Sequence, residues 1–126
     1  MRKVTVQEQA KRDKQSLIAR IARIRYEHET GGITINGMQL ATDRQSQALI
    51  TGAFSSAKDA KETGEDFSLR WKSNSGWIGL DADQIIAMGR AVRQHVRLCF
   101  NREEELTESV EAGTFTESML DEGWPE

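Results

Sequence analysis

The amino-acid sequence predicts an α+β fold that is mainly helical: an N-terminal helix, two β-hairpin-plus-helix units and a short C-terminal helix. Three observations predict it. Apolar residues recur at helical spacing in three long segments, two short alternating segments each contain a tight turn, and a capping residue follows each turn. The 126 residues suffice for a single domain, in which we distinguish a basic start (residues 1–15), a core (16–112) and an acidic end (113–126).

The first helix is expected from about Gln7 to Glu29, because one apolar stripe recurs within it at helical spacing. That stripe comprises Leu17, Ile21 and Ile24. Before residue 16 apolar side chains are few, so this part is expected to fray or to dock on something else. Gly31 and Gly32 end the helix, since glycine readily takes the left-handed conformation past a last helical turn.

Residues 33–40 contain the clearest local signal, a β-hairpin. The central Asn36-Gly37 pair tolerates the positive φ angles of a type I′ turn. The register that follows from this turn places four apolar side chains on one face: Ile33, Ile35, Met38 and Leu40. The other face carries Thr34 and Gln39, which are expected to meet water or a partner.

A second helix is expected to begin at Thr42, whose hydroxyl would cap it, with Gln45 completing a capping box. Its predicted apolar stripe comprises Leu49, Ile50, Ala53, Phe54 and Ala57. Gly64 lies near its end. The pattern then repeats, because a turn at residues 73–76 is followed by Asp81 as a cap and by Gln84 three residues later. The strands of this second hairpin carry Leu69, Trp71, Ile78 and Leu80.

The repeat indicates a diverged duplication, with a glycine inside each following helix, Gly52 and Gly89. A helical glycine costs about 1 kcal/mol relative to alanine, so we expect these two regions to allow close packing of the two helices on each other. The third helix is predicted to extend past Leu106, and a shorter one to follow from Thr114. The expected buried side of the third helix comprises Ile85, Met88, Val92, Val96, Cys99 and Phe100.

Charge is unevenly distributed along the chain, although the formal net charge is only −3. Lysine and arginine dominate up to Arg25, and carboxylates dominate from Asn101 onward. Such asymmetry is compatible with two solvated helix faces, with steering of a charged partner, or with a meeting of the two ends within one chain or between copies. We favour solvated faces, because exposed ion pairs contribute little to stability.

Residues that could support catalysis or metal binding have simpler structural explanations. His28 and His95 lie in different predicted helices without metal-ligand spacing. Cys99 follows the apolar spacing, which favours a buried, inert thiol, and a lone cysteine forms no internal disulfide. Asp81 and Asp83 are better explained by capping than by a shared cation. We therefore assign no catalytic residue, no cofactor and no metal, and we expect a protein that is not an enzyme.

No apolar run approaches the roughly 20 residues of a membrane span, and the polar N-terminal stretch lacks the apolar segment of a secretory signal. Cytoplasmic residence and no membrane partner are therefore expected.

Binding features are more promising than catalytic ones. Trp71 is expected in the core, whereas alternation places Trp77 on the opposite side from Ile78, where a helix or a partner must cover it. Trp124 either folds back or anchors a partner. The basic first helix lacks interleaved aromatic residues, which makes nucleic acid a weak candidate. The residues expected to bind a partner are Lys11, Arg12, Ile18, Arg20, Thr34, Gln39, Trp77 and Trp124.

Several segments carry a likeness to a known family. In the first half they are His28-Glu29-Thr30-Gly31-Gly32-Ile33, Ala41-Thr42-Asp43-Arg44-Gln45-Ser46-Gln47 and Ile50-Thr51-Gly52-Ala53. In the second half they are Trp71-Lys72, Gly76-Trp77, Leu80-Asp81-Ala82, Ala91-Val92, His95-Val96 and Phe100. With these segments the chain resembles, from about Arg12 to Met119, the domain of unknown function 4376 (DUF4376) family of tailed bacteriophages. The segment from Thr42 to Gln47 is the most specific piece.

The resemblance implies a role in a phage tail, since members of the family occur on tail and tail-fibre proteins or beside fibre genes. The expected function is a virion component that joins tail-fibre or baseplate subunits. An assembly chaperone absent from the finished virion is the first alternative, and a small nucleic-acid-binding regulator is the second. The implied location is the virion tail, with host cytoplasm during assembly, and self-association into a homo-oligomer stays open.

Overall fold

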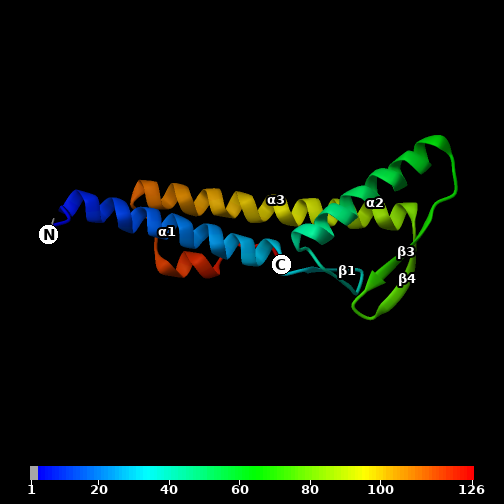
Figure 1. Ribbon diagram of the computed structural model, residues 1–126, viewed down its shortest axis with the longest axis horizontal. Coiled ribbons are helices and arrows are strands. Elements are labelled where there is room, and N and C mark those ends of the chain that lie inside the picture. Colours follow the sequence, from blue (N-terminus) through cyan, green and yellow to red (C-terminus); the bar gives the residue numbers. More distant parts are fainter. Residues whose placement is uncertain (1–2) are drawn as a thin grey trace. The chain divides into compact units, whose positions relative to one another are not determined.

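The computed structural model describes residues 3–126 and has the expected α+β composition (Figure 1). Its elements are α1 (Val6–Glu29), β1 (Ile33–Ile35), β2 (Met38–Leu40), α2 (Arg44–Thr63), β3 (Ser68–Ser73), β4 (Gly76–Asp81), α3 (Ala82–Ala112) and a 3₁₀ helix, η1 (Glu117–Asp121). Each predicted helix and hairpin is present, and the short C-terminal helix is of the 3₁₀ type. Arg2, one of the basic residues near the N-terminus, lies outside the described residues.

The structure contains two compact units. That the chain forms a single domain stays a prediction. The first unit combines the N-terminal residues up to His28 with residues Leu98–Pro125, and the second consists of Glu29–Arg97 together with Glu126. Helix α3 therefore contributes its first part to the second unit and its last part to the first.

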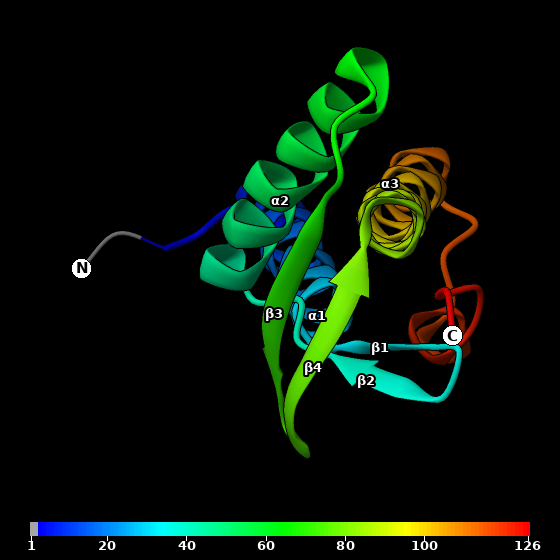
Figure 2. The ribbon, with the colours of Figure 1, turned by 90° about the vertical axis from the view of Figure 1, so that its right-hand side faces the viewer.

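The second unit has the predicted core of two hairpins and two helices (Figure 2). Both hairpin registers agree with the turns, since Ile35 pairs with Met38 in the first and Trp71 with Ile78 in the second. The buried residues of the shared core are Leu40, Ile50, Ala57, Leu80, Ile85, Met88 and Val92. Both hairpin-plus-helix repeats contribute residues to this core, which confirms that the two repeats close over one apolar interior.

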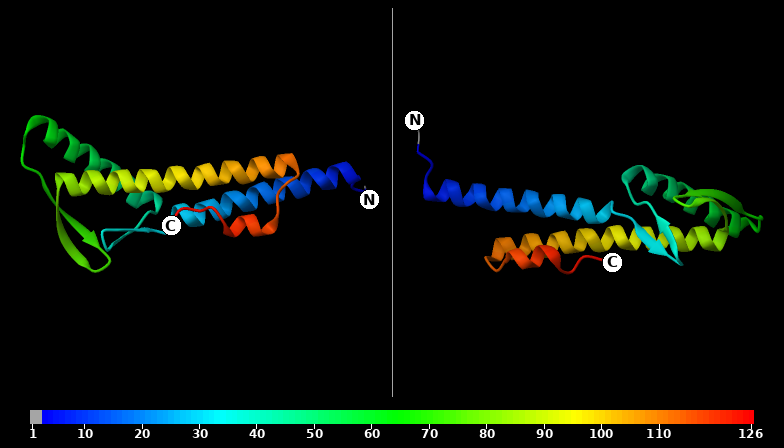
Figure 3. Two further views of the ribbon diagram at one scale, coloured as in Figure 1. Left: turned by 180° about the vertical axis from the view of Figure 1, so that it is seen from behind. Right: turned by 90° about the horizontal axis from the view of Figure 1, so that it is seen from below.

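The first unit has a core of its own, built by α1, the last part of α3 and η1 (Figure 3). Ile21, Leu106 and Leu120 are buried there. Residues packed around them are Leu17, Ile24, Val110, Phe115, Met119 and Trp124. The predicted stripe of the first helix is thus confirmed, but it packs in a core distinct from that of the hairpins.

The start of α2 differs from the prediction. Thr42 is fully buried and does not cap the helix. Asp43 is the N-cap and accepts a hydrogen bond from the backbone N–H of Ser46. The predicted capping box of the third helix is confirmed, because the side chains of Asp81 and Gln84 each accept a hydrogen bond from the other's backbone N–H.

Two residues of the predicted apolar stripes point to solvent instead. Leu49 in α2 is 60% exposed and Phe100 in α3 is 42% exposed. The two helical glycines also differ from each other. Gly89 is buried and packs against Phe54 of α2, as expected for close helix packing, but Gly52 is exposed and faces open space among the described residues. The expected close approach of the two helices is therefore made at Gly89, and the Gly52 position itself takes no part in it.

We expect the cap of α2 to make stability depend on acid pH. The Ser46 hydroxyl, and after it the Ser46 backbone N–H, donates to the Asp43 carboxylate and lowers the pKa of Asp43 below 3.8. A lowered folded-state pKa gives stabilisation that is complete above the unfolded-state pKa and is lost as the pH falls through the folded-state pKa. Asp43→Asn keeps a capping oxygen but does not titrate. Urea unfolding followed below about pH 4 should show a shallower loss of stability in the variant. Identical acid profiles would contradict this cause.

Candidate functional site

A network of polar side chains joins the end of α1 to the start of α2, and all of its members lie in the second unit. The Thr42 hydroxyl donates to the backbone carbonyl of Glu29 at 2.7 Å and accepts from the backbone N–H of Gly32 at 2.9 Å. The Glu29 carboxylate, 1% exposed, is paired with the Arg44 guanidinium at 2.6 Å and accepts a hydrogen bond from Gln47 at 3.0 Å. Gln47 also donates to the carbonyl of Thr42 at 2.7 Å.

This network accounts for the most specific segment of the sequence. Four of its polar side chains, those of Thr42, Asp43, Arg44 and Gln47, bond within the chain. A buried carboxylate such as that of Glu29 is tolerated only when it is paired and hydrogen-bonded. The segment therefore ties both ends of the first hairpin to the start of α2, and its conspicuous residues have a structural role.

The opposite charges at the two ends of the sequence meet within the first unit. Lys14 of α1 is paired with Glu111 of α3, and Arg20 with Glu117 of η1 at 2.6 Å. Arg25 is paired with Glu103 at 2.7 Å, and both side chains of this pair are largely buried. Among the alternatives for the charge asymmetry, the structure has the one in which the ends pair within one chain. These three cations of the first helix are therefore already neutralised.

Trp124 takes the first of its two predicted alternatives and folds back. Its ring stacks on that of His28 with centroids 4.7 Å apart, and its indole N–H donates to the carbonyl of Leu120 at 2.7 Å. Arg102 holds the same segment by donating to the carbonyls of Met119 and Glu122. The Trp124 ring is thus already engaged within the first unit.

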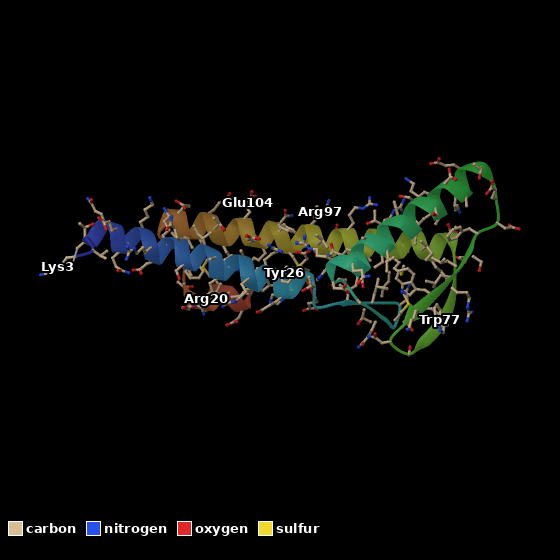
Figure 4. All side chains as sticks on the ribbon, in the orientation of Figure 1. Lys3, Arg20, Tyr26, Trp77, Arg97 and Glu104 are labelled. Carbon is tan, nitrogen blue, oxygen red and sulfur yellow. The ribbon has the colours of Figure 1, made fainter. Side chains whose placement is uncertain are left out.

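The outer face of the second hairpin is exposed throughout and carries one large aromatic ring. Alternation along β3 and β4 places six residues on this face, which we call the Trp77 face: Ser68, Arg70, Lys72, Trp77, Gly79 and Asp81. Trp77 is 61% exposed and lies opposite Lys72 in the register (Figure 4). Neither a helix nor the other hairpin buries this ring, so the alternative in which a helix covers it is wrong. Arg70 and Lys72 were missed as candidates, although the same alternation points them outward.

The remaining candidate residues are divided between the two units. Lys11 and Arg12 are exposed on α1, and Ile18 is half-buried there. Thr34 and Gln39 are exposed and directly opposite each other in the first hairpin. The structure thus brings together Thr34 and Gln39 as a pair. In all, the second unit holds Thr34, Gln39 and Trp77, and the first holds Lys11, Arg12, Ile18, Arg20 and Trp124.

Metal-ligating and nucleophilic side chains are the next candidates in the described part of the chain. Within residues 3–126, no three histidine, cysteine or acidic side chains form a group that could hold a metal ion. Cys99 is buried. The Asp83 carboxylate forms an ion pair with the Lys61 ammonium group at 2.7 Å, and it raises the pKa of this lysine. None of the helices in the described part combines the length and apolar character that a bilayer crossing requires.

Comparison with known families matches the sequence profile described as "Domain of unknown function (DUF4376)" to residues 12–122. The chain belongs to the DUF4376 family. The match spans both units and includes the Glu29–Thr42 network as well as the Trp77 face, so the DUF4376 segment comprises nearly all of the fold described above. Neither the curated proteins nor the solved structures contain a significant match to the chain.

Proposed function

We propose that this DUF4376 protein is a non-catalytic component of a bacteriophage tail that binds a tail-fibre or baseplate subunit through the Trp77 face. The observation that carries the proposal is the 61% exposure of Trp77 on a face without a buried residue. Tryptophan is enriched among the residues that dominate binding energy in protein interfaces. A large ring left in water is therefore well explained by a partner that covers it.

The surroundings of Trp77 favour a protein partner with carboxylates. Arg70 and Lys72 lie on the same face, and Asp81 at its far end is already used as a helix cap. Arginine beside an exposed aromatic ring is the composition typical of interface centres. The two-stranded face offers contact area and hydrogen-bonding cations on an open surface, which supports binding of a protein rather than catalysis on a small substrate.

The two alternative functions have unequal support. A chaperone that assembles fibres and is absent from the finished virion would use the same face. Only the presence or absence of the protein in the mature virion distinguishes it from a virion component. A nucleic-acid-binding regulator has less support, because Lys14, Arg20 and Arg25 of the basic helix are already paired with carboxylates.

The test is to measure the protein in virions of the phage that encodes it, with Trp77→Ala compared to Tyr26→Ala, another exposed aromatic residue. Wild type and Tyr26→Ala should be present in a fixed ratio to tail proteins. Loss of a hot-spot tryptophan that contributes about 2 kcal/mol of binding free energy should weaken binding to the tail, and with it incorporation into virions, about 30-fold. Circular dichroism would confirm that both variants fold.

Absence of the wild-type protein from virions that need it for assembly would instead support the chaperone. Equal incorporation of the two variants would reject the Trp77 face as the binding surface.

A further inference from the structure

A groove lies between α2 and α3 of the second unit, and all of the residues that line it belong to that unit. Its cavity measures about 280 Å³. Arg93 and Arg97 of α3 line it together with Thr51 of α2, and Figure 4 labels Arg97 near the start of α2. The apolar floor of this surface, which we call the α2–α3 groove, consists of Ile50, Phe54, Gly89, Val92 and Val96.

Three cations at the groove are not neutralised by a carboxylate. The Arg93 guanidinium and the Lys58 ammonium group lie 4.4 and 5.7 Å from the centroid of the Phe54 ring, and Arg97 donates a hydrogen bond to the Gln94 side chain. In the part of the chain that the structure describes, the ion pairs join other side chains and include none of these cations. The contacts with the ring and the amide orient the cationic groups and leave their charge available to a ligand.

The helix segments that form the groove contain no acidic residue. Neither residues 44–58 of α2 nor residues 84–97 of α3 include an aspartate or a glutamate. The Glu29 carboxylate, which accepts a hydrogen bond from Gln47 beside the groove, is 1% exposed and already paired with Arg44. The groove is therefore a cationic surface that attracts negative charge. A ligand that fits it combines negative charge with an apolar group.

The size of the α2–α3 groove favours a side chain of a partner protein over a free small molecule. Pockets for small-molecule ligands ordinarily have volumes of about 300–1,000 Å³ and enclose most of the ligand. At about 280 Å³ the groove receives one large apolar side chain and leaves the remainder of the ligand outside. Apolar grooves commonly bind an amphipathic helix, whose apolar face lies in the groove.

We propose that the α2–α3 groove binds an acidic amphipathic helix of a partner protein, with an apolar side chain on the floor and carboxylates at Arg93 and Arg97. The two arginines are four residues apart, so they lie on one face of α3, about one turn from each other. Carboxylates at the same spacing on the partner helix pair with both, and a guanidinium group can form two hydrogen bonds with one carboxylate. This site lies outside the Trp77 face and so goes beyond the proposed function.

A nucleic acid fits the groove less well than an acidic helix. The cations would attract phosphates, but single strands are bound largely by stacking of bases on exposed aromatic rings. Phe54, the aromatic residue of the floor, is only 8% exposed and packs against Gly89. The buried aliphatic side chains of Ile50 and Val92 offer neither stacking nor hydrogen bonds to a base.

A designed peptide of about 18 residues is the probe, because shorter isolated helices are marginal in water. Its leucines recur every three or four residues to form one apolar stripe, and glutamates flank this stripe. A matched peptide has glutamine at each glutamate position. Titration of the acidic peptide into the full-length protein should shift the amide NMR signals of Val92 and Val96. The glutamine peptide should bind about tenfold more weakly at low salt, because its ion pairs are lost.

Variants of the protein test the same contacts from the other side. Arg97→Glu should weaken binding of the acidic peptide about fivefold or more, because an attraction becomes a repulsion. Arg97→Lys keeps the charge and should retain most of the affinity. Arg23→Glu, an exposed site in α1 with the same change in net charge as Arg97→Glu, should bind the peptide like wild type.

An acidic peptide that does not bind, or that binds no better than the glutamine peptide, overturns the proposal. So does equal affinity of Arg97→Glu and Arg23→Glu, or a single-stranded oligonucleotide that displaces the peptide and binds more tightly. Circular dichroism of each variant guards against misfolding. Trp77→Ala should bind the peptide like wild type whether or not it enters virions, so this inference and the proposed function can fail independently.

Discussion

Replacing Gly89 by alanine should lower the free energy of unfolding by about 1–3 kcal/mol, the usual cost of overpacking a core. A Cβ atom at Gly89 would lie 2.5 Å from Cδ2, 2.9 Å from Cγ and 3.0 Å from Cβ of Phe54. The close atoms include the root of the Phe54 side chain, which cannot move without its backbone. The Arg93 guanidinium and the Lys58 ammonium group lie 4.4 and 5.7 Å from the centroid of the Phe54 ring.

Gly52→Ala is the matched control, because it makes the same change inside a helix. A Cβ at Gly52 meets no heavy atom of the described residues within 4 Å, so the gain in helix propensity should raise stability by up to about 1 kcal/mol. Urea unfolding of both variants measures the two effects. Changes of equal sign would show that Phe54 does not pack on Gly89 as described.

Replacing Thr42 by valine should destabilise the protein by about 2 kcal/mol or more. The substitution keeps the shape of the side chain but removes the hydroxyl, leaving the Gly32 N–H and the Glu29 carbonyl without this partner. An unsatisfied buried polar group costs about 1–3 kcal/mol. Urea unfolding gives the magnitude, and amide hydrogen exchange at Gly32 should become faster than in the wild type.

Thr42→Ser keeps the hydroxyl and loses only a methyl group, so it should cost about 1 kcal/mol or less. A valine variant as stable as the serine variant would mean that the two hydrogen bonds contribute little.

The hairpins could be predicted in full because their determinants are local. Asn36 and Gly37 both have positive φ, and the pairing of strands follows directly from that turn. The start of α2 could not be predicted as well, since Thr42 and Asp43 are both good capping residues. The choice is made by the Glu29 carbonyl, which lies 13 residues away in sequence, and Asp43 is left to cap the helix.

Helical spacing identified buried stripes but not their edges. Phe100 follows the same spacing as Cys99 and Val96, yet it lies at the rim of the helix face and remains exposed. Nor could spacing show that the α1 stripe packs in a separate core, because Leu106 and Leu120 lie 85 and 99 positions after Ile21 in the sequence.

The candidate binding residues were predictable to the extent that they depend on strand alternation. Trp77 is exposed as alternation requires, and Arg70 and Lys72 share its face for the same reason. The pairing of Arg20 with Glu117 depends on tertiary structure, so its neutralisation could not be foreseen from the basic composition of the first helix.

Helix α3 belongs to both cores, with Ile85 and Met88 in one and Leu106 in the other. The compact units of a chain are ordinarily joined by an exposed linker, where genetic recombination can separate them without disrupting the fold of either unit. Here a cut between Arg97 and Leu98 would fall in the middle of a helix and leave unpaired N–H and C=O groups on both fragments. The two units are therefore expected to be inherited together, as an inseparable pair rather than as exchangeable modules.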